Sequence, residues 1–149
     1  MCIRDRTIIL SLASADPEQS MSDLANAIER IRVDLGIYIY FPNMLDELHP
    51  SLADPATSAI ESQLLLSDKG YSVGTIEYPN MPAGKVIVIK SSIVSRLPID
   101  TIVYANQNPA FPNEPTANQF FTEEQFESYR ESGYHIAKRM LKDTTLRFP

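Results

Sequence analysis

The chain of 149 residues has 13 basic and 19 acidic residues, 11 prolines and one cysteine, and its formal charge is −6. Its hydrophobic share of 44% can fill the core of one domain. The acidic balance argues against nucleic-acid binding, because such proteins cluster Lys and Arg against phosphates. The single cysteine excludes an internal disulfide, and no apolar run approaches the ~20 residues that a membrane span needs.

The first six residues, Met1–Arg6, resemble the translation of a transposase adapter used in sequencing libraries. They do not have the pattern of a secretory signal, because neither an apolar core region nor a small-residue cleavage site follows them. A β-branched run starts directly at Thr7, as though cut from the middle of a fold. We therefore predict that residues 1–6 are an artefact and that residues 7–149 form a single unit whose N-terminal part is missing. The alternative is a short genuine leader.

A strand is predicted first, because the apolar run Thr7–Leu12 is too short for a helix and is typical of a buried strand. Ala13–Gln19 contains an Asp-Pro pair and predicts a loop. Ser20 and Asp23 have the spacing of a capping box and predict the start of a helix. An apolar stripe follows at helical spacing, and a glycine stands where a left-handed cap belongs: Leu24, Ile28, Ile31, Leu35 and then Gly36.

Ile37–Phe41 alternates aliphatic and aromatic residues and predicts a second strand, which ends at Pro42. Strand, helix and strand in this order predict a βαβ unit with a parallel strand pair. The proline-containing stretch Pro42–Pro55 predicts a surface crossing. Ala59–Leu66 fits either a short helix or an extended run.

Two strands, Tyr71–Tyr78 and Lys85–Ser91, are predicted to form a hairpin through Pro79–Gly84. The second strand is apolar at successive positions, so we expect both of its faces to be covered. A short helix over Ile99–Asn106 follows, with Pro98 at its first position. Gln107–Asn118 is a loop containing three prolines.

The last helix is expected to begin after Thr122, with Gln125 as the capping-box partner. Its apolar face comprises Phe126, Tyr129, Gly133, Ile136, Ala137 and Met140. A glycine inside a helix costs about 1 kcal/mol relative to alanine. We therefore expect another backbone to approach closely at Gly133.

Gly70–Gly74 matches the G-x-S-x-G pattern, in which a sharp strand-to-helix turn exposes a nucleophilic serine. A triad of Ser72, Asp100 and His135 would follow the hydrolase chain order. The context contradicts an elbow, because a polar turn precedes Gly70 and a strand pattern follows Gly74. We interpret the match as a turn leading into a hairpin strand, with a small serine hydrolase using Ser72 as the alternative.

The remaining polar and aromatic candidates have ordinary structural explanations. His135 lies one position from the apolar face of its helix, and His49 precedes a proline in a loop. Acidic residues in the first turns of the last helix, Glu123, Glu124 and Glu127, favour its dipole. Tyr38, Tyr40 and Phe41 could line an apolar pocket or simply stand on a half-exposed strand. No phosphate loop, dinucleotide fingerprint or metal cluster is present in the sequence.

Two stretches resemble the C-terminal part of large bacterial patatin-like phospholipases. The first runs from Asp16-Pro17 through Asp23–Gly36. The second, more specific stretch comprises Asn108–Pro112, Thr116–Phe121, Phe126–Arg130 and Gly133–His135. Between them, Gly74–Pro79 and Val86–Lys90 lie where that family has a hairpin. Ala13–Ala15 departs from the family pattern, because the expected acidic residue is absent.

The resemblance implies a fragment of a three-layer α/β/α fold, with a βαβ unit, a β-hairpin and a long C-terminal helix. It implies a parent enzyme that hydrolyses lipid esters with a Ser–Asp dyad and needs no metal and no organic cofactor. The catalytic Asp of the family lies in a D-G-G motif shortly before the strand equivalent to Thr7–Leu12, and the nucleophile lies far earlier. This chain has no Asp-Gly pair and no glycine-rich oxyanion loop, so no catalytic residue carries over.

The expected partner of the full-length protein is a lipid or another ester substrate, and membrane association would come through missing regions. The implied location is the bacterial cytoplasm or the membrane surface. A non-enzymatic docking module is the other alternative, and an exposed apolar patch around Phe111, Phe120 and Phe121 would favour it.

Overall fold

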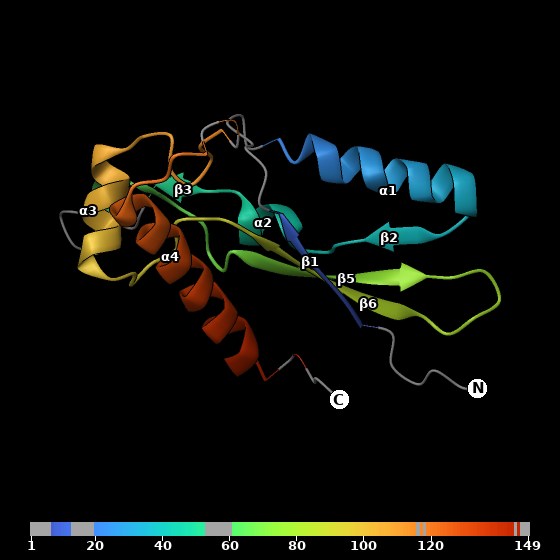
Figure 1. The fold of residues 1–149 in the computed structure, drawn as a ribbon. Helices are drawn as coiled ribbons and strands as arrows, with labels where there is room; N and C mark the ends of the chain where they lie inside the picture. The colour runs from blue at the N-terminus through green and yellow to red at the C-terminus, as the bar shows by residue number, and fades with distance from the viewer. Residues whose placement is uncertain are drawn as a thin grey trace.

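The computed structural model describes residues 7–12, 20–52, 61–115, 117, 119–144 and 146. Its fold is α/β, as expected, and contains a mixed sheet of four strands with helices on both faces (Figure 1). The strand order is β1 (Thr7–Leu12), β6 (Gly84–Lys90), β5 (Tyr71–Glu77) and β2 (Tyr38–Tyr40). The helices are α1 (Ser22–Leu35), α2 (Met44–Leu48), α3 (Ile99–Gln107) and α4 (Glu123–Lys142).

Strands β5 and β6 form the antiparallel hairpin that the sequence predicts, with Ser72 opposite Val88. The prediction that the two strands of the βαβ unit pair with each other is wrong. β1 pairs in parallel with β6, placing Thr7 beside Lys85, whereas β2 pairs with β5 at the opposite edge. The physical reason is that β6 is apolar on both faces and therefore occupies the interior of the sheet. The hairpin separates the two strands that α1 connects.

Each face of the sheet carries its own hydrophobic cluster. On the face covered by α1 and α2, Leu24 and Leu48 pack in one cluster with Val86 and Val88. On the opposite face, Ile136 and Met140 of α4 pack with Tyr71 and Ile87. Figure 1 shows α1 along the β2 side of the sheet and α3 beside α4 at the other end. β6 thus has both faces covered, as predicted, because adjacent residues point to opposite sides.

The ends of α1 and α3 differ slightly from the predictions. Helix α1 begins at Ser22 after Met21, whose backbone is left-handed at φ 51°, and no side chain caps it, so the Ser20 cap is wrong. Gly36 does adopt the predicted left-handed cap, at φ 65°, and its N–H donates to the Arg32 carbonyl. Pro98 is the N-cap of α3 rather than its first residue.

Helix α4 begins as predicted, because the Thr122 hydroxyl accepts from the Gln125 N–H at 3.1 Å. The reciprocal half of the capping box does not form: the Gln125 side chain donates to Glu114 instead, at 2.6 Å. The expected backbone approach at Gly133 is also wrong. A Cβ added at Gly133 would meet nothing within 4 Å, so packing does not require this glycine.

The stretch Pro42–Pro55, predicted to cross the surface, contains helix α2. Pro42 and Pro50 lie on either side of Met44–Leu48, so the segment between them has no proline and can form a helical turn. Leu48 is completely buried, so the segment contributes to the core. It continues into β3 (Ser51–Leu52), which pairs antiparallel with β4 (Leu65–Leu66). The end of the Ala59–Leu66 stretch is a 3₁₀ turn over Glu61–Gln63 followed by β4. Met1–Arg6 and the predicted loop Ala13–Gln19 lie outside the described residues.

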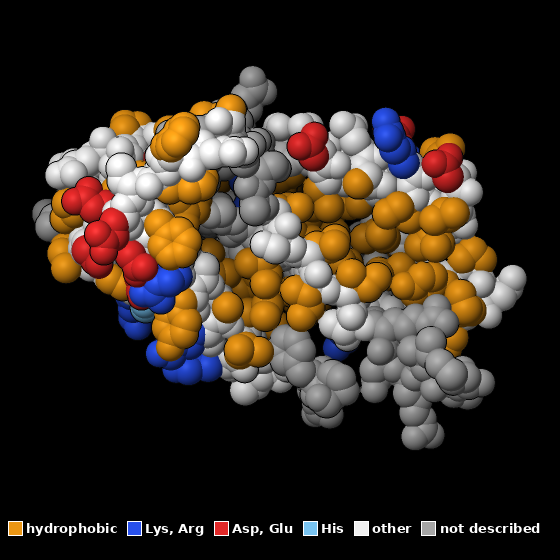
Figure 2. Space-filling view, in the orientation of Figure 1, with side chains coloured by type: hydrophobic (Ala, Val, Ile, Leu, Met, Phe, Trp, Pro, Cys, Tyr) orange, Lys and Arg blue, Asp and Glu red, His pale blue; other side chains and the backbone are white. Residues whose placement is uncertain are grey.

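Strand β1 has the predicted bounds but not the predicted burial. It stands at the edge of the sheet, and Ile8, Ile9 and Leu10 are 43%, 52% and 40% exposed. Figure 2 shows hydrophobic side chains gathered over the region that β1 and the underside of α1 occupy in Figure 1. The reason is coverage: α1 lies nearest β2 at the far edge, and α4 crosses the other end of the sheet. β1 is therefore an apolar edge strand open on both faces.

Candidate functional site

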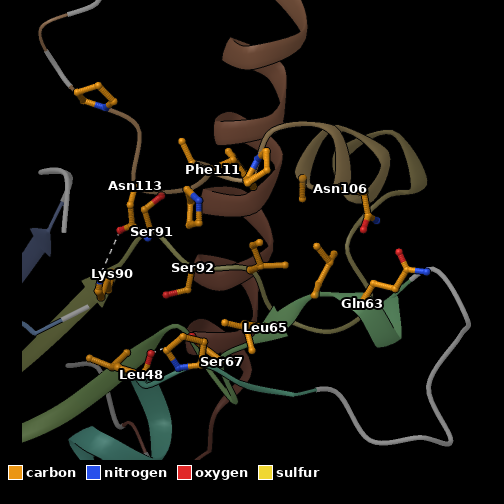
Figure 3. A pocket seen from close by; sticks show the side chains of 18 residues that line it. Leu48, Gln63, Leu65, Ser67, Lys90, Ser91, Ser92, Asn106, Phe111 and Asn113 are labelled. Atoms are coloured by element: carbon orange, nitrogen blue, oxygen red, sulfur yellow. Dashed lines mark hydrogen bonds between the residues drawn. The ribbon is translucent and has the colours of Figure 1, made fainter. Parts of the chain in front are cut away.

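A cavity of about 700 Å³ lies between the carboxyl end of β6, helix α3 and the proline-rich loop that follows it. Its volume falls in the range of small-molecule sites. Figure 3 shows Lys90 and Ser91 on one side, Gln63 and Asn106 on the other, and Phe111 above Ser92. Among the described lining residues, apolar side chains stand beside a few neutral polar ones and one lysine.

Lys90 is the only charged residue among the described residues that line this cavity, and it lies at one end of it. It is the last residue of β6, and the register sets it beside Leu12 of β1. Its side chain is 6% exposed, and the ammonium donates to the Asn113 amide oxygen at 3.4 Å.

Two of the polar side chains in the wall donate hydrogen bonds to backbone carbonyls. Ser67 donates to the Leu48 carbonyl at 2.8 Å. Asn106 donates to the Ile102 carbonyl at 3.0 Å, one turn back in α3. These bonds tie the wall to α2 and α3. Ser67 therefore uses its proton structurally and is not presented as a nucleophile.

The proline-rich loop is fixed to both C-terminal helices, so this wall is already formed. Phe111 is buried between Tyr104 and Tyr129, with ring centroids 5.4 and 4.8 Å away in edge-to-face geometry. Glu114 accepts from the Tyr104 hydroxyl at 3.1 Å and from Gln125, and its N–H donates to the Tyr129 hydroxyl at 3.3 Å. Burial, assisted by Glu114, raises the pKa of Tyr104 to about 12.

Ser72 does not have the geometry of a nucleophile. Gly70 is a left-handed bend at φ 72°, and Tyr71–Glu77 is a continuous strand without a following helix. The Ser72 side chain is fully buried, and its hydroxyl has no hydrogen-bond partner within the described residues. The structure thus confirms a turn leading into a hairpin strand.

The three residues of the hypothetical triad, Ser72, Asp100 and His135, are not brought together. Ser72 faces the side of the sheet that α1 and α2 cover, since it alternates with Tyr71, which packs against α4. His135 belongs to α4 on the opposite face, and its Nε2 lies 3.7 Å from Glu131 one turn earlier. Asp100 is exposed in the first turn of α3. His49 is the exposed C-cap of α2.

The aromatic residues of the second strand do not line the cavity. Tyr38 and Tyr40 are exposed on the β2 edge, and the Tyr40 hydroxyl donates to Glu77 at 3.0 Å. Phe41 packs in the cluster below α1. Glu123 and Glu124 do lie in the first turn of α4, as expected from its dipole.

Within the described part of the chain, no group of three or more His, Cys, Asp and Glu side chains could hold a metal ion. Over the same residues, none of the helices combines the length and apolar character that crossing a bilayer requires. The cavity walls described here contain no carboxylate, imidazole or thiol that could transfer a proton.

Sequence reasoning missed this cavity, including Lys90 and Asn113. The pattern of β6 predicts a strand, but it does not show that the lysine at its end meets a loop that lies beyond the next helix. The one available signal was a lysine that ends an apolar run and is followed by two serines.

Comparisons of the chain with protein-family models, with curated proteins and with solved structures found no match. The resemblance carried by the two stretches described above therefore stays a prediction.

Proposed function

We propose that this chain is the C-terminal part of a lipid acylhydrolase related to the patatin-like phospholipases. Its Ser–Asp dyad would lie in upstream sequence. The observation that carries the proposal is the open edge of β1. The same edge supports the prediction that another strand or a covering helix packs against residues 7–12 in the complete protein.

The composition of β1 is that of an interior strand. β1 pairs with β6 on one side only, and Ile8, Ile9 and Leu10 are about half exposed. Native edge strands are usually blunted by charge, proline or a bulge. Thr7–Leu12 contains no charged residue and no proline. Burying each of these aliphatic side chains against a neighbouring strand and covering helices would stabilise the fold by about 1.5–3 kcal/mol.

The chemistry proposed for the parent protein is acyl transfer to serine followed by hydrolysis. The serine oxygen attacks the ester carbonyl while the aspartate takes its proton, and an oxyanion hole stabilises the tetrahedral charge. The aspartic acid then gives the proton to the departing alcohol, and water releases the fatty acid by the reverse steps. Burial of Ser72 supports the prediction that this chain contributes scaffold rather than nucleophile.

A docking module is the second candidate, favoured by aromatic side chains at the start of α4. Phe120 is 92% exposed, and Phe121 and Phe126 are also exposed. Phe111, which the sequence groups with them, is instead buried in the core. The surface available for docking is thus smaller than predicted, and it lies beside Glu123 and Glu124.

The direct test is the esterase activity of the purified chain on p-nitrophenyl esters, together with labelling by a fluorophosphonate probe. We expect no turnover above buffer and no labelling, because the buried Ser72 hydroxyl cannot reach an ester. The matched variant is Ser72→Ala. Turnover or labelling that disappears in Ser72→Ala would contradict the proposal and establish a small serine hydrolase.

A further inference from the structure

We propose that a second copy of this chain binds to one side of helix α4, so that the two α4 helices pack antiparallel and cross at Gly133. The contact is made by the exposed residues Phe126, Gly133, Tyr134 and Leu141, which we call the α4 face. This pairing does not rest on the proposed function, since its residues and its test belong to this chain alone.

Helix α4 packs against the rest of the chain through a stripe that is mostly polar. Its buried residues are Gln125, Ser128, Ser132, Ile136 and Met140. Ser132 donates to the Ser92 carbonyl at 2.8 Å. In the first half of the helix, the buried positions thus lie one residue before those that the apolar spacing predicts. Phe126 and Gly133 are therefore exposed, although the sequence pattern assigns them to the core.

The α4 face presents large apolar side chains to solvent. Phe126, Tyr134 and Leu141 are 59%, 52% and 66% exposed. They follow one another at spacings of eight and seven residues, so they lie on one side of the helix. Figure 2 shows hydrophobic side chains along α4, together with acidic ones at its start and basic ones further along. Pairing with another helix removes this apolar surface from water.

Gly133 marks the place where the two helices cross. Helix α4 spans Glu123–Lys142, so Gly133 lies at its middle. Glycine is unfavourable inside a helix, and a Cβ at Gly133 would meet nothing within 4 Å among the described residues. The distance between packed helices depends on the side chains at the contact, so a glycine there allows a close approach. The second copy thus supplies the neighbouring backbone that the sequence predicts at Gly133.

The order of charges along α4 selects a second copy as the occupant and sets its direction. Acidic residues occupy the first half and basic residues the second: Glu123, Glu124, Glu127 and Glu131, then Lys138, Arg139 and Lys142. Arg130 is the exception, and it donates to Glu127 at 2.8 Å. An antiparallel pair brings Glu127 of each copy beside Lys138 of the other, because these residues lie six and five positions from Gly133. A parallel pair would place like charges together.

The charges orient the pair, and the apolar side chains supply its affinity. Lys138 already lies 5.3 Å from the centre of the Tyr134 ring within the chain. Exposed ion pairs contribute little to affinity, but they select a direction of binding. The apolar contact is symmetric, as in other two-fold interfaces. Phe126 of each copy meets Leu141 of the other, seven and eight positions from Gly133.

The test is sedimentation equilibrium of the whole chain up to about 500 μM, since a single helix pair buries less surface than a standard interface and binds weakly. All chains carry Ile9→Lys, which places a charge on the open edge of β1 at a residue that is 52% exposed. Association through β1 is thereby disfavoured. We expect a reversible dimer, and a chain that stays monomeric over the whole range would overturn the proposal.

Gly133→Gln fills the crossing point with a long side chain and should weaken the dimer at least about tenfold. The variant should fold, because glutamine favours a helix more than glycine does and the position is open. Glu124→Gln is the matched control, since it introduces the same residue nine positions away, on the opposite side of the helix. Its dimer affinity should be unchanged. Equal affinities for the two variants would refute the assignment to the α4 face.

A charge exchange tests the direction of pairing. Glu127→Lys should weaken the dimer, because it brings two cations together across the pair. Adding Lys138→Glu to the same chain should restore the affinity, since the two charges are then exchanged rather than alike. A double variant that binds no better than Glu127→Lys alone would exclude the antiparallel arrangement.

Discussion

Gly133 is an interior residue of α4 with open space around it, so alanine fits there without a clash. Gly133→Ala should raise the free energy of unfolding by about 1 kcal/mol, because alanine loses less backbone entropy in a helix. Urea denaturation at fixed pH measures the change. An unchanged or lower midpoint would mean that this glycine has a role that the packing of α4 does not reveal.

Gly74 is the matched contrast, because a Cβ at this position would lie 2.7 Å from the Phe41 ring and 2.9 Å from the Tyr40 carbonyl oxygen. Gly74→Ala should therefore lower stability, by about 1–3 kcal/mol as for other overpacked cores. The two glycines look alike in sequence, and only the contacts across β2 and β5 separate them.

One buried tyrosine, Tyr71, and two partly buried ones, Tyr104 and Tyr129, make the fold sensitive to alkaline pH. Burial is the main cause that raises the pKa of Tyr71 and Tyr129, and it raises the pKa of Tyr104 to about 12. The unfolded chain loses these protons near the ordinary value of 10.0, whereas the folded chain keeps them. Stability is thus complete below that value and falls as pH rises through it and toward 12, because the unfolded state binds fewer protons.

Chemical denaturation over this pH range, with tyrosinate absorbance as a second readout, measures the effect. In Tyr104→Phe the free energy of unfolding should fall less steeply with pH, since one tyrosine with a raised pKa is removed. Equal stability on both sides of the ordinary tyrosine pKa would contradict the expectation.

At the scale of the element, α4 depends on its N-cap. The Thr122 hydroxyl accepts from the Gln125 N–H at 3.1 Å, and Gln125 in turn holds Glu114 of the cavity loop. Thr122→Ala should destabilise the chain by about 1 kcal/mol. Thr122→Ser retains the oxygen and should cost much less in the same urea measurement; equal losses in both variants would mean that the cap hydrogen bond contributes nothing.

Local patterns predicted the elements that local forces build. The β5–β6 hairpin follows from the alternation of its residues, the Gly36 cap from the backbone preference of glycine, and the Thr122 cap from a side-chain hydrogen bond. In each case the residues that interact are close together in the sequence. α2 was missed because its single turn lies between prolines and has too few residues for a helical period.

Contacts between distant segments could not be predicted in the same way. β1 pairs with β6 rather than β2, and this choice depends on which strand buries both faces. The cavity is assembled from α2, β6, α3 and the proline-rich loop, so Lys90 and Asn113 meet only in the folded chain. The G-x-S-x-G match was correctly interpreted from its flanking residues, because strand context is local information.

At the scale of the whole molecule, the open edge of β1 should make the isolated chain self-associate. An unpaired apolar edge is a template for another strand. Ile9 is 52% exposed on that edge, and Ile9→Lys should reduce association by placing a charge there. Sedimentation velocity over a concentration series measures it.

Val33→Lys is the control, because Val33 is 71% exposed on α1 rather than on the sheet edge. It should leave the association unchanged. Identical sedimentation of the Ile9→Lys variant and the unmodified chain would show that β1 is not the associating edge.

We propose that β1 belongs to a larger acylhydrolase sheet, and long-read sequencing across the locus tests this most directly. We expect an open frame that continues upstream of Thr7, with a D-G-G motif shortly before it and a G-x-S-x-G on a strand–helix turn much earlier. The same reads should replace residues 1–6 with native sequence. A stop codon directly upstream, with a true start at Met1, would contradict the account and favour a small binding protein without a catalytic dyad.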